Sequence, residues 1–328
     1  QDNMKVIAVA LVLAVIAFVV NAESAFDPNI MKAVNSNPQN KWKAGINKFA
    51  AMSVEEVRAM LGGQVPQYKR YTEAQMRIIA QRAAPSNNPT SFDARKQWPD
   101  CVHPIRNQAH CGSCWAFGAT EALSDRFCIA SNGKVNVVLA PQDPVSCDYS
   151  NYGCNGGNLQ YVWEYMKSTG VVPEACFPYV SQNGTEPACP STCIDGKTSF
   201  SSQKYKLKSY EKVSPTFLFW ERESKIESAL IQSGPLETGF TVYQDFLQYQ
   251  SGVYHHVTGG LLGGHAVKIV GYGVTSDNIK YWIVANSWGT DWGIDGFFWI
   301  QKGNNECGIE ADVYDGVPDL SHVPQPLN

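Results

Sequence analysis

Two cysteines in the stretch CGSCWAFG, residues 111–118, have types and spacing that indicate chemistry. A Cys-x-x-Cys pair is typical of a redox dithiol, of half a zinc site, or of a nucleophile beside a structural cysteine. The apolar residues that follow recur at helical spacing and predict a helix beginning at Cys114. The N–H groups and dipole at a helix N-terminus favour a thiolate, so Cys114 is the candidate nucleophile, with a small buried core cysteine as the alternative.

A histidine and an asparagine downstream are candidates for the partners that a thiolate nucleophile needs. His265 begins an alternating, β-branched run after two glycines, and this pattern predicts a strand. Asn286 could hold the imidazole tautomer, and Trp288 could shield that hydrogen bond from water. The order Cys114, His265, Asn286, with separations of 151 and 21 residues, favours nucleophilic catalysis by a cysteine and a histidine.

Two further features suit the binding and cleavage of a peptide. Gln108 precedes Cys114 by six residues and could direct its amide at an oxyanion, together with the backbone N–H of Cys114. The stretch CNGG at 154–157 offers backbone without obstructing side chains, which suits an extended peptide held by main-chain hydrogen bonds. The histidine pair at 255 and 256 is interpreted as structural.

Composition and cysteine distribution exclude several other functions. The 328 residues carry a net charge of −4 and are 44% hydrophobic, which is typical of a globular chain with a large core in two lobes or two small domains. No basic cluster exceeds two adjacent residues, so nucleic-acid binding is excluded. All ten cysteines lie between Cys101 and Cys307, spread over more than 200 residues, which argues against a redox dithiol. A zinc site would need a second ligand pair, and the sequence has none at the required spacing.

The chain divides into three parts by composition. An apolar run from Val6 to Val20 predicts a signal peptide over residues 1–22, since a membrane anchor would need about 20 apolar residues. Residues 23–87 have no cysteine and a net charge of +4 (9 basic, 5 acidic), and they form a removable segment. Residues 88–328 carry −8 (16 basic, 24 acidic) and form the mature domain. The cysteines after a signal peptide imply an oxidising compartment with disulfides, and the opposite charges suggest that the two parts bind each other.

The motifs CGSCWAF, GCNGG, GGHAV and NSWGTDWG occur in this order, and through them the chain resembles the papain family of cysteine proteases. The resemblance covers residues 91 to 318, and SFDAR, ALSDRFC and ECGIEADV are similar to its cathepsin B branch. It implies an α+β fold of two lobes, with a helical lobe carrying Cys114 and an antiparallel β-barrel carrying His265 and Asn286. The active-site cleft lies between the lobes. The independent helical pattern after Asn158 and the strand-like runs after Gly239 agree with this fold.

The resemblance also implies site residues, partners and location. The expected substrates are peptides and proteins, and the expected inhibitors are the N-terminal segment, acting within the same chain, and proteins of the cystatin type. The protein is expected to be a monomer and to need neither a cofactor nor a metal. The location is the secretory pathway, leading to a lysosome or an equivalent acidic vacuole, or to secretion. The implied substrate-binding residues are Gly156, Gly157, Gly264, Ala266, Trp288 and Asp312. The implied disulfides are Cys101 with Cys128, Cys111 with Cys154, Cys147 with Cys189, and Cys176 with Cys193, which leaves Cys114 and Cys307 unpaired.

Three features bear on specificity and processing. Asp312 matches the acidic residue in the floor of the P2 pocket of the cathepsin B branch and predicts acceptance of arginine at P2. The loop that obstructs one end of the cleft in that branch, and there gives dipeptidyl carboxypeptidase activity, is reduced here to FPYVSQNGTEPA, residues 177–188, without histidine. Endopeptidase action with weak dipeptidyl carboxypeptidase activity is therefore expected. Asn183 lies in the one Asn-x-Ser/Thr sequon and is a candidate for glycosylation.

Two other classes share part of this pattern. A catalytically inactive binding homologue usually loses the cysteine or the histidine, whereas this chain has both together with Asn286 and Gln108. A transglutaminase could share a Cys-His pair, but the removable segment and the CNGG stretch fit a protease better. Hydrolysis of a peptide reporter, blocked by an epoxysuccinyl thiol trap, separates the three classes.

Overall fold

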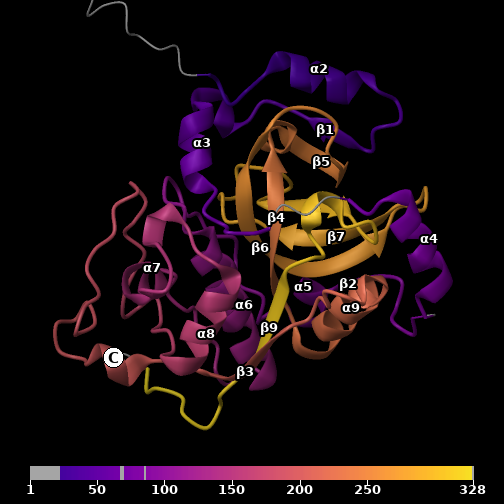
Figure 1. Ribbon diagram of the computed structural model, residues 1–328. Helices are drawn as coiled ribbons and strands as arrows, with labels where there is room; N and C mark the ends of the chain where they lie inside the picture. Colours follow the sequence, from indigo (N-terminus) through magenta and orange to yellow (C-terminus); the bar gives the residue numbers. More distant parts are fainter. Residues whose placement is uncertain (1–22, 67–69, 85, 327–328) are drawn as a thin grey trace, which may run out of the picture.

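Two large hydrophobic cores, beside a small third cluster around Val270 and Ile283, divide the protein into the two lobes seen in Figure 1. The computed structural model describes residues 23–66, 70–84 and 86–326, and the predicted signal peptide at 1–22 lies outside them. Within the described ranges, no helix is both long and apolar enough to cross a membrane. One core surrounds the helix that begins at Cys114, and the other lies within the sheet, so the predicted α+β fold with two lobes is confirmed.

The helical lobe is built around α6 (Cys114–Ala130), which is buried along nearly its whole length. Every face of the helix packs against protein, so its polar residues are buried as well, including Glu121 and Asp125. α8 (Leu159–Ser168) begins after Asn158, whose side chain accepts a hydrogen bond from the N–H of Gln160 and so caps the helix. Both helices begin where the sequence predicts. The shorter elements of the lobe are α7 (Gln142–Cys147), η2 (Gly153–Asn155) and η3 (Phe200–Gln203).

The other lobe is a sheet with the strand order β1-β5-β8-β7-β6-β4-β9-β3, and β2 pairs with β6. The described pairs are antiparallel except for β5 with β8, which run parallel. The same lobe also has the helical elements α5 (Ala94–Gln97), η4 (Phe219–Glu221), α9 (Arg222–Ser233), α10 (Gln244–Leu247) and η5 (Glu306–Gly308). The strands are β1 (Trp42–Ala44), β2 (Phe92–Asp93), β3 (Leu207–Lys212), β4 (Leu236–Tyr243), β5 (Tyr249–Tyr254), β6 (Leu261–Val274), β7 (Lys280–Ala285), β8 (Phe297–Gln301) and β9 (Val313–Pro318).

The strand that carries His265 begins earlier than the sequence pattern predicts. β6 starts at Leu261, four residues before His265, because Gly263 and Gly264 pair in register with Val242 and Thr241 of β4. Glycine has a low intrinsic preference for strands, so the alternating pattern before His265 is weak. Pairing with β4 overrides that preference, and His265 lies within a strand rather than at its end.

A buried ion cluster joins the helix of Cys114 to the strand of His265. The Lys268 Nζ of β6 lies 2.7 Å from Asp125 Oδ2 and 3.7 Å from Glu121 Oε2, both on α6. All three side chains are at most 5% exposed. Removal of one partner from such a cluster costs about 3–5 kcal/mol, because the remaining charge stays buried and unpaired. The cluster therefore fixes the two elements that bear the candidate catalytic residues.

The N-terminal segment, residues 23–87, packs against the sheet, and its part up to Leu61 shares the core of the sheet. Trp42 of β1 lies 5.1 Å from the ring of Tyr254, and Phe49 meets Trp288 edge-on at 5.0 Å. β1 pairs antiparallel with β5, so the segment extends the sheet as well as covering it. The other elements of the segment are α2 (Pro28–Ser36), η1 (Lys48–Ala51), α3 (Val54–Met60) and α4 (Glu73–Arg82).

Four disulfides cross-link the mature domain, and the thiols of Cys114 and Cys307 are free and buried. The pairs are those that the resemblance implies: Cys101–Cys128, Cys111–Cys154, Cys147–Cys189 and Cys176–Cys193. The two cysteines of CGSC therefore differ chemically, because Cys111 is bonded to Cys154 while Cys114 keeps its thiol.

Candidate active site

Cys114, His265 and Asn286 meet at the boundary between the lobes, and all three are fully buried in this structure. The Nε2 of His265 lies 2.8 Å from the Oδ1 of Asn286. The indole of Trp288 stacks on the imidazole at 4.7 Å, which covers that hydrogen bond as the sequence predicts. The backbone N–H of Ala266, next to His265, faces the thiol of Cys114 and lowers its pKa. The buried Nδ1 of His265 has no hydrogen-bond partner among the described residues.

Burial keeps the cysteine and the histidine neutral. Desolvation raises the pKa of the Cys114 thiol to about 11, although backbone N–H groups, including those of Ala266 and Gly62, lower it. Desolvation lowers the pKa of His265 to about 4, and its hydrogen bond to Asn286 opposes this only in part. A thiolate and imidazolium pair is therefore disfavoured while the site is covered.

Gln108 is held by hydrogen bonds at both ends of its amide. Its Oε1 accepts from the Oγ of Ser287 at 2.7 Å, and its Nε2 donates to the carbonyl of Cys111 at 2.8 Å. The same Nε2 donates to the carbonyl oxygen of Met60, also at 2.8 Å. Gln108 thus presents an N–H to a peptide carbonyl beside Cys114, the type of contact that would stabilise an oxyanion.

The N-terminal segment supplies the cover over the site. Its residues 62–64 form backbone hydrogen bonds with both walls: Gly63 N–H to the oxygen of Gly264 (3.0 Å), Gly157 N–H to the oxygen of Gly62 (2.8 Å), and Gln64 N–H to the oxygen of Gly157 (2.9 Å). The group that Gly62 presents to the Cys114 sulfur is an N–H. A thiolate attacks a carbonyl carbon, so this N–H offers the thiol a donor rather than the carbon that it would attack.

The glycines at the cleft are required by the close approach of backbones. A Cβ on Gly62 would lie 1.7 Å from the oxygen of Gly112, and a Cβ on Gly156 would lie 2.7 Å from the oxygen of Gly62. Of the implied substrate-binding residues, Gly156, Gly157 and Gly264 therefore contact the segment directly. Ala266 contacts Cys114 through its backbone.

Asp312 lies next to the place where Val65 of the segment packs against β4. A Cβ on Gly239 would lie 2.1 Å from Val65 Cγ1, so this glycine of β4 makes room for the side chain. The N–H of Gly239 donates to the backbone oxygen of Asp312 at 3.3 Å. The carboxylate of Asp312 is paired with the Nζ of Lys212 at 2.6 Å, and the two side chains are 9% and 30% exposed.

The short segment 177–188 is held against the helical lobe. The Oε1 of Gln142 accepts from the N–H groups of Val180 (2.8 Å) and Ser181 (3.1 Å). Glu186 accepts from the N–H of Cys154 at 2.8 Å, which ties the end of the segment to the cleft wall. Asn183 is exposed and turned through its own bonds to Thr185, and its glycosylation stays a prediction.

Several contacts at the site are not evident from sequence patterns. Ser287 orients Gln108, Lys212 neutralises Asp312, and LGGQV at 61–65 occupies the cleft. The adjacent glycines of LGGQV are a sequence signal that could have identified this stretch, since glycines allow two backbones to approach closely. Among the described residues, no cluster of histidine, cysteine and carboxylate side chains is arranged to hold a metal ion.

Residues 88–317 match the family described as papain family cysteine protease. The chain belongs to the papain family. It is thus a cysteine protease, and the two curated relatives that follow are named cathepsin B-like. Cathepsin B-like CP3 of Giardia intestinalis is 39% identical over 306 residues, covering 93% of this chain and 97% of the relative. Cathepsin B-like cysteine proteinase 4 of Caenorhabditis elegans is 39% identical over 343 residues, covering 97% and 100%.

Solved structures of related cysteine proteases agree in fold. Procathepsin B S9 from Trypanosoma congolense superposes with a TM-score of 0.78 at 31% identity, covering 90% of this chain and 99% of that one. The proform of the ragweed cysteine protease Amb a 11 superposes with a TM-score of 0.70 at 27% identity, over 89% of this chain and 84% of that one. The structures that resemble this chain thus include proteases in their precursor form.

Proposed function

We propose that this papain-family protease is a cathepsin B-like endopeptidase made as a zymogen, in which residues 23–87 are an inhibitory propeptide. The observation that carries the proposal is the segment across the cleft, with Gln108 bonded to the Met60 carbonyl and the N–H of Gly62 at Cys114. A location in the secretory pathway, a lysosome-like vacuole or the exterior suits four disulfides.

The proposed mechanism begins once the segment is removed. Water then reaches Cys114 and His265, the desolvation that raises one pKa and lowers the other is relieved, and the proton moves from the thiol to the free Nδ1. The thiolate attacks a peptide carbonyl, and the amide N–H of Gln108 with the backbone N–H of Cys114 stabilises the oxyanion. The imidazolium, held by Asn286, protonates the leaving amine, and a water activated by His265 hydrolyses the acyl-enzyme.

The cleft is proposed to be open at both ends, which favours endopeptidase action over removal of C-terminal dipeptides. The segment 177–188 has no histidine for a terminal carboxylate, and Gln142 holds it to the helical lobe. A free C-terminal peptide and its blocked counterpart, matched in sequence, distinguish the two activities. We expect dipeptide release at least about tenfold less efficient than internal cleavage, since a charge-assisted bond is missing.

Two variants complete this comparison. Cys114→Ser should abolish both activities, which shows that they come from this site. His110→Ala removes the exposed imidazole of a residue that lies beside the segment 177–188, where its backbone N–H donates to the backbone oxygen of Gln182 at 3.0 Å, and we expect it to leave the ratio unchanged. Dipeptide release as efficient as internal cleavage would contradict the open cleft.

Arginine at P2 is proposed to bind Asp312, in competition with Lys212. The Lys212 ammonium already pairs with that carboxylate, so an arginine must displace it before forming its own charge-assisted bonds. We expect Lys212→Met to raise kcat/KM for an Arg-P2 substrate about tenfold relative to Phe-P2. Lys225→Met, at an exposed lysine that pairs with Glu221, is the matched control. Asp312→Ala should remove the gain in the Lys212→Met background, and an Arg/Phe ratio that stays constant through all the variants would contradict the assignment.

Acid activation is proposed to act through Glu306 rather than through every ion pair of the segment. Lys41 and Asp277 pair at 2.7 Å, and Arg70 and Glu306 at 2.9 Å. The hydrogen bond from Lys41 lowers the pKa of Asp277 to about 2, so that pair persists at pH 4.5. Burial raises the pKa of Glu306 above 4.5, although Arg70 opposes the shift. Arg70 stabilises the charged carboxylate of Glu306 only while the segment is bound, so ionisation of Glu306 favours binding of the segment. As the pH falls toward the raised pKa, Glu306 is protonated and this attraction is lost.

Glu306→Gln is therefore expected to speed zymogen processing at pH 6.5 by about fivefold and to flatten its dependence on acid. The estimate corresponds to about 1 kcal/mol, discounted because the Arg70 side chain is 53% exposed. The processing rate between pH 4.5 and 7 is the measurement. Asp277→Asn is the matched control, which should change the rate without changing the shape of the profile. Identical profiles for wild type and Glu306→Gln would contradict this trigger.

A further inference from the structure

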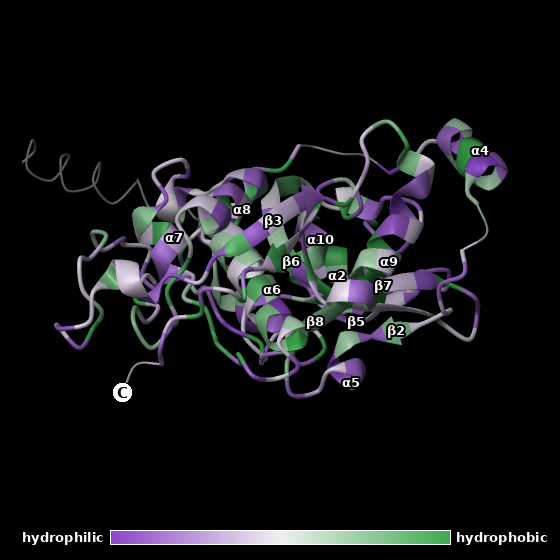
Figure 2. Ribbon diagram, turned by 90° about the horizontal axis from the view of Figure 1, so that it is seen from below, coloured by the Kyte–Doolittle hydropathy of each residue, from purple (hydrophilic) through white to green (hydrophobic). Residues whose placement is uncertain are grey.

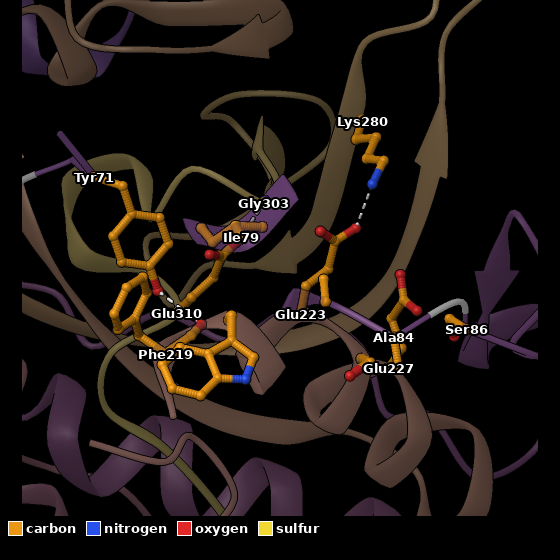
Figure 3. A pocket seen from close by; sticks show the side chains of 13 residues that line it. Tyr71, Ile79, Ala84, Ser86, Phe219, Glu223, Glu227, Lys280, Gly303 and Glu310 are labelled. Atoms are coloured by element: carbon orange, nitrogen blue, oxygen red, sulfur yellow. Dashed lines mark hydrogen bonds and ion pairs between the residues drawn. The ribbon is translucent and has the colours of Figure 1, made fainter. Parts of the chain in front are cut away.

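A pocket outside the cleft is enclosed jointly by the N-terminal segment and the mature domain (Figure 3). It has a volume of about 160 Å³ and lies between the α4 region and the start of α9. Figure 3 shows Tyr71 and Phe219 together on one side and the ion pair of Lys280 with Glu223 on the other. One wall consists of Tyr71, Ile79, Ala83, Ala84 and Ser86 of the segment, so removal of the segment would expose the opposite wall.

The segment is held at this pocket by aromatic and arginine side chains. The ring of Tyr71 lies 5.4 Å from that of Phe219, and its hydroxyl accepts from Arg222 Nη1 at 3.2 Å. The guanidinium of Arg82 lies 5.0 Å from the ring centroid of Trp220, a cation–π contact.

The contact does not depend on a shared core. α4 has no buried residue, and Figure 2 shows it at one end of the molecule. Its attachment therefore rests on the side chains near its two ends, Tyr71 and Arg82, on Arg70 with Glu306, and on one backbone bond, from the N–H of Tyr71 to the oxygen of Asn304 at 3.0 Å. Such side-chain recognition is separable from the backbone pairing in the cleft.

The face that receives these side chains is built by the mature domain alone. Glu223 pairs with Lys280 and Lys302, each at 2.9 Å, and the Lys302 ammonium lies 4.5 Å from the ring centroid of Tyr272. These contacts do not involve the segment, so they survive its removal.

An aromatic ledge, Phe217–Trp220, borders this face. Phe217 is 88% exposed and Leu218 40% exposed even with the segment in place. Exposed apolar residues beside fixed charges are typical of a surface that binds another polypeptide, and tryptophan is enriched among residues that dominate such binding.

We propose that this face is an exosite of the matured enzyme, which binds a segment of protein substrates that carries a tyrosine and arginines. The exosite rests on the proposed function, since the segment must first be removed. The chemistry of its ligand is displayed by the zymogen: Tyr71 on Phe219, Arg82 over Trp220, and Arg70 on the carboxylate of Glu306. A substrate anchored here is delivered to the cleft at a raised local concentration.

The test uses enzyme matured from the full chain and two fluorogenic peptides with the same cleavable sequence. One carries residues 70–84 after a flexible linker, and the other carries the same residues in scrambled order. We expect the tagged peptide to have a KM about tenfold lower with the same kcat. A tag with Tyr71→Ala and Arg82→Glu should lose the advantage while the enzyme stays unaltered.

Trp220→Ala in the enzyme should remove the advantage of the tag and leave hydrolysis of the scrambled peptide unchanged. Thermal unfolding of this variant shows whether its fold is intact, and the altered tag gives the same information without any change in the enzyme. Equal KM values for the tagged and scrambled peptides would overturn the exosite. Failure of the enzyme to cleave either peptide would instead contradict the proposed function.

Discussion

Replacement of Gln108 by alanine is expected to lower kcat about 10²–10³-fold, because one oxyanion donor typically contributes this much. The Nε2 of Gln108 already bonds to a peptide carbonyl, that of Met60, at 2.8 Å in the covered site. KM should change little, since the bond strengthens only as the negative charge develops. The measurement is steady-state hydrolysis of a short peptide by the matured enzyme.

Gln142→Ala is the matched control for Gln108→Ala. Both glutamines are fully buried with hydrogen-bonded amides, but Gln142 bonds to Val180 and Ser181, away from the thiol. Loss of a buried amide should therefore destabilise both variants, whereas only Gln108→Ala should lose kcat. An equal loss of kcat in the two variants, or a change confined to KM, would contradict the oxyanion role.

The same substitution should weaken the propeptide. Removal of the Gln108 amide also removes its bond to Met60, so Gln108→Ala zymogen should expose Cys114 more readily to a thiol-alkylating reagent. One residue thus serves substrate and inhibitor through the same N–H.

Local patterns predict the elements that carry the chemistry. The helix from Cys114 follows from its apolar spacing, and α8 follows from the Asn158 cap and Gly170. The order of Cys114, His265 and Asn286 identifies residues that the fold brings together, because their types and order match one kind of catalysis. These signals lie in short stretches, and short stretches determine local structure.

Contacts between distant residues could not be predicted in this way. Lys212 and Asp312 are 100 residues apart, and no spacing rule connects β3 to the turn before β9. Their pairing nevertheless determines whether the carboxylate of Asp312 is free to bind a substrate side chain. Similarly, the resemblance identifies the segment as an inhibitor, but only the structure gives the N–H of Gly62 at the thiol.

Gly62→Leu is expected to raise the activity of the unprocessed zymogen about 100-fold. A Cβ at this position would lie 1.7 Å from the oxygen and 2.5 Å from the carbonyl carbon of Gly112, which are backbone atoms that cannot turn aside. The segment must therefore lift, and it loses the bond from Gly157 N–H and the N–H contact with Cys114. The clash and the two lost bonds weaken binding of the segment to the cleft by about 3 kcal/mol, and this free energy corresponds to a change of about 100-fold in activity.

The rate at which an epoxysuccinyl trap labels Cys114 at pH 7, before processing, measures this opening. Gly45→Ala is the matched control in the same segment, because its Cβ would meet the end of the flexible Gln250 side chain at 2.8 Å, which can move. The labelling rate should rise in Gly62→Leu and stay near wild type in Gly45→Ala. Slow labelling of Gly62→Leu, at the wild-type rate, would mean that the segment does not inhibit by its close passage over the thiol. Equally rapid labelling of both variants would mean that the segment is held too weakly for Gly62 to be decisive.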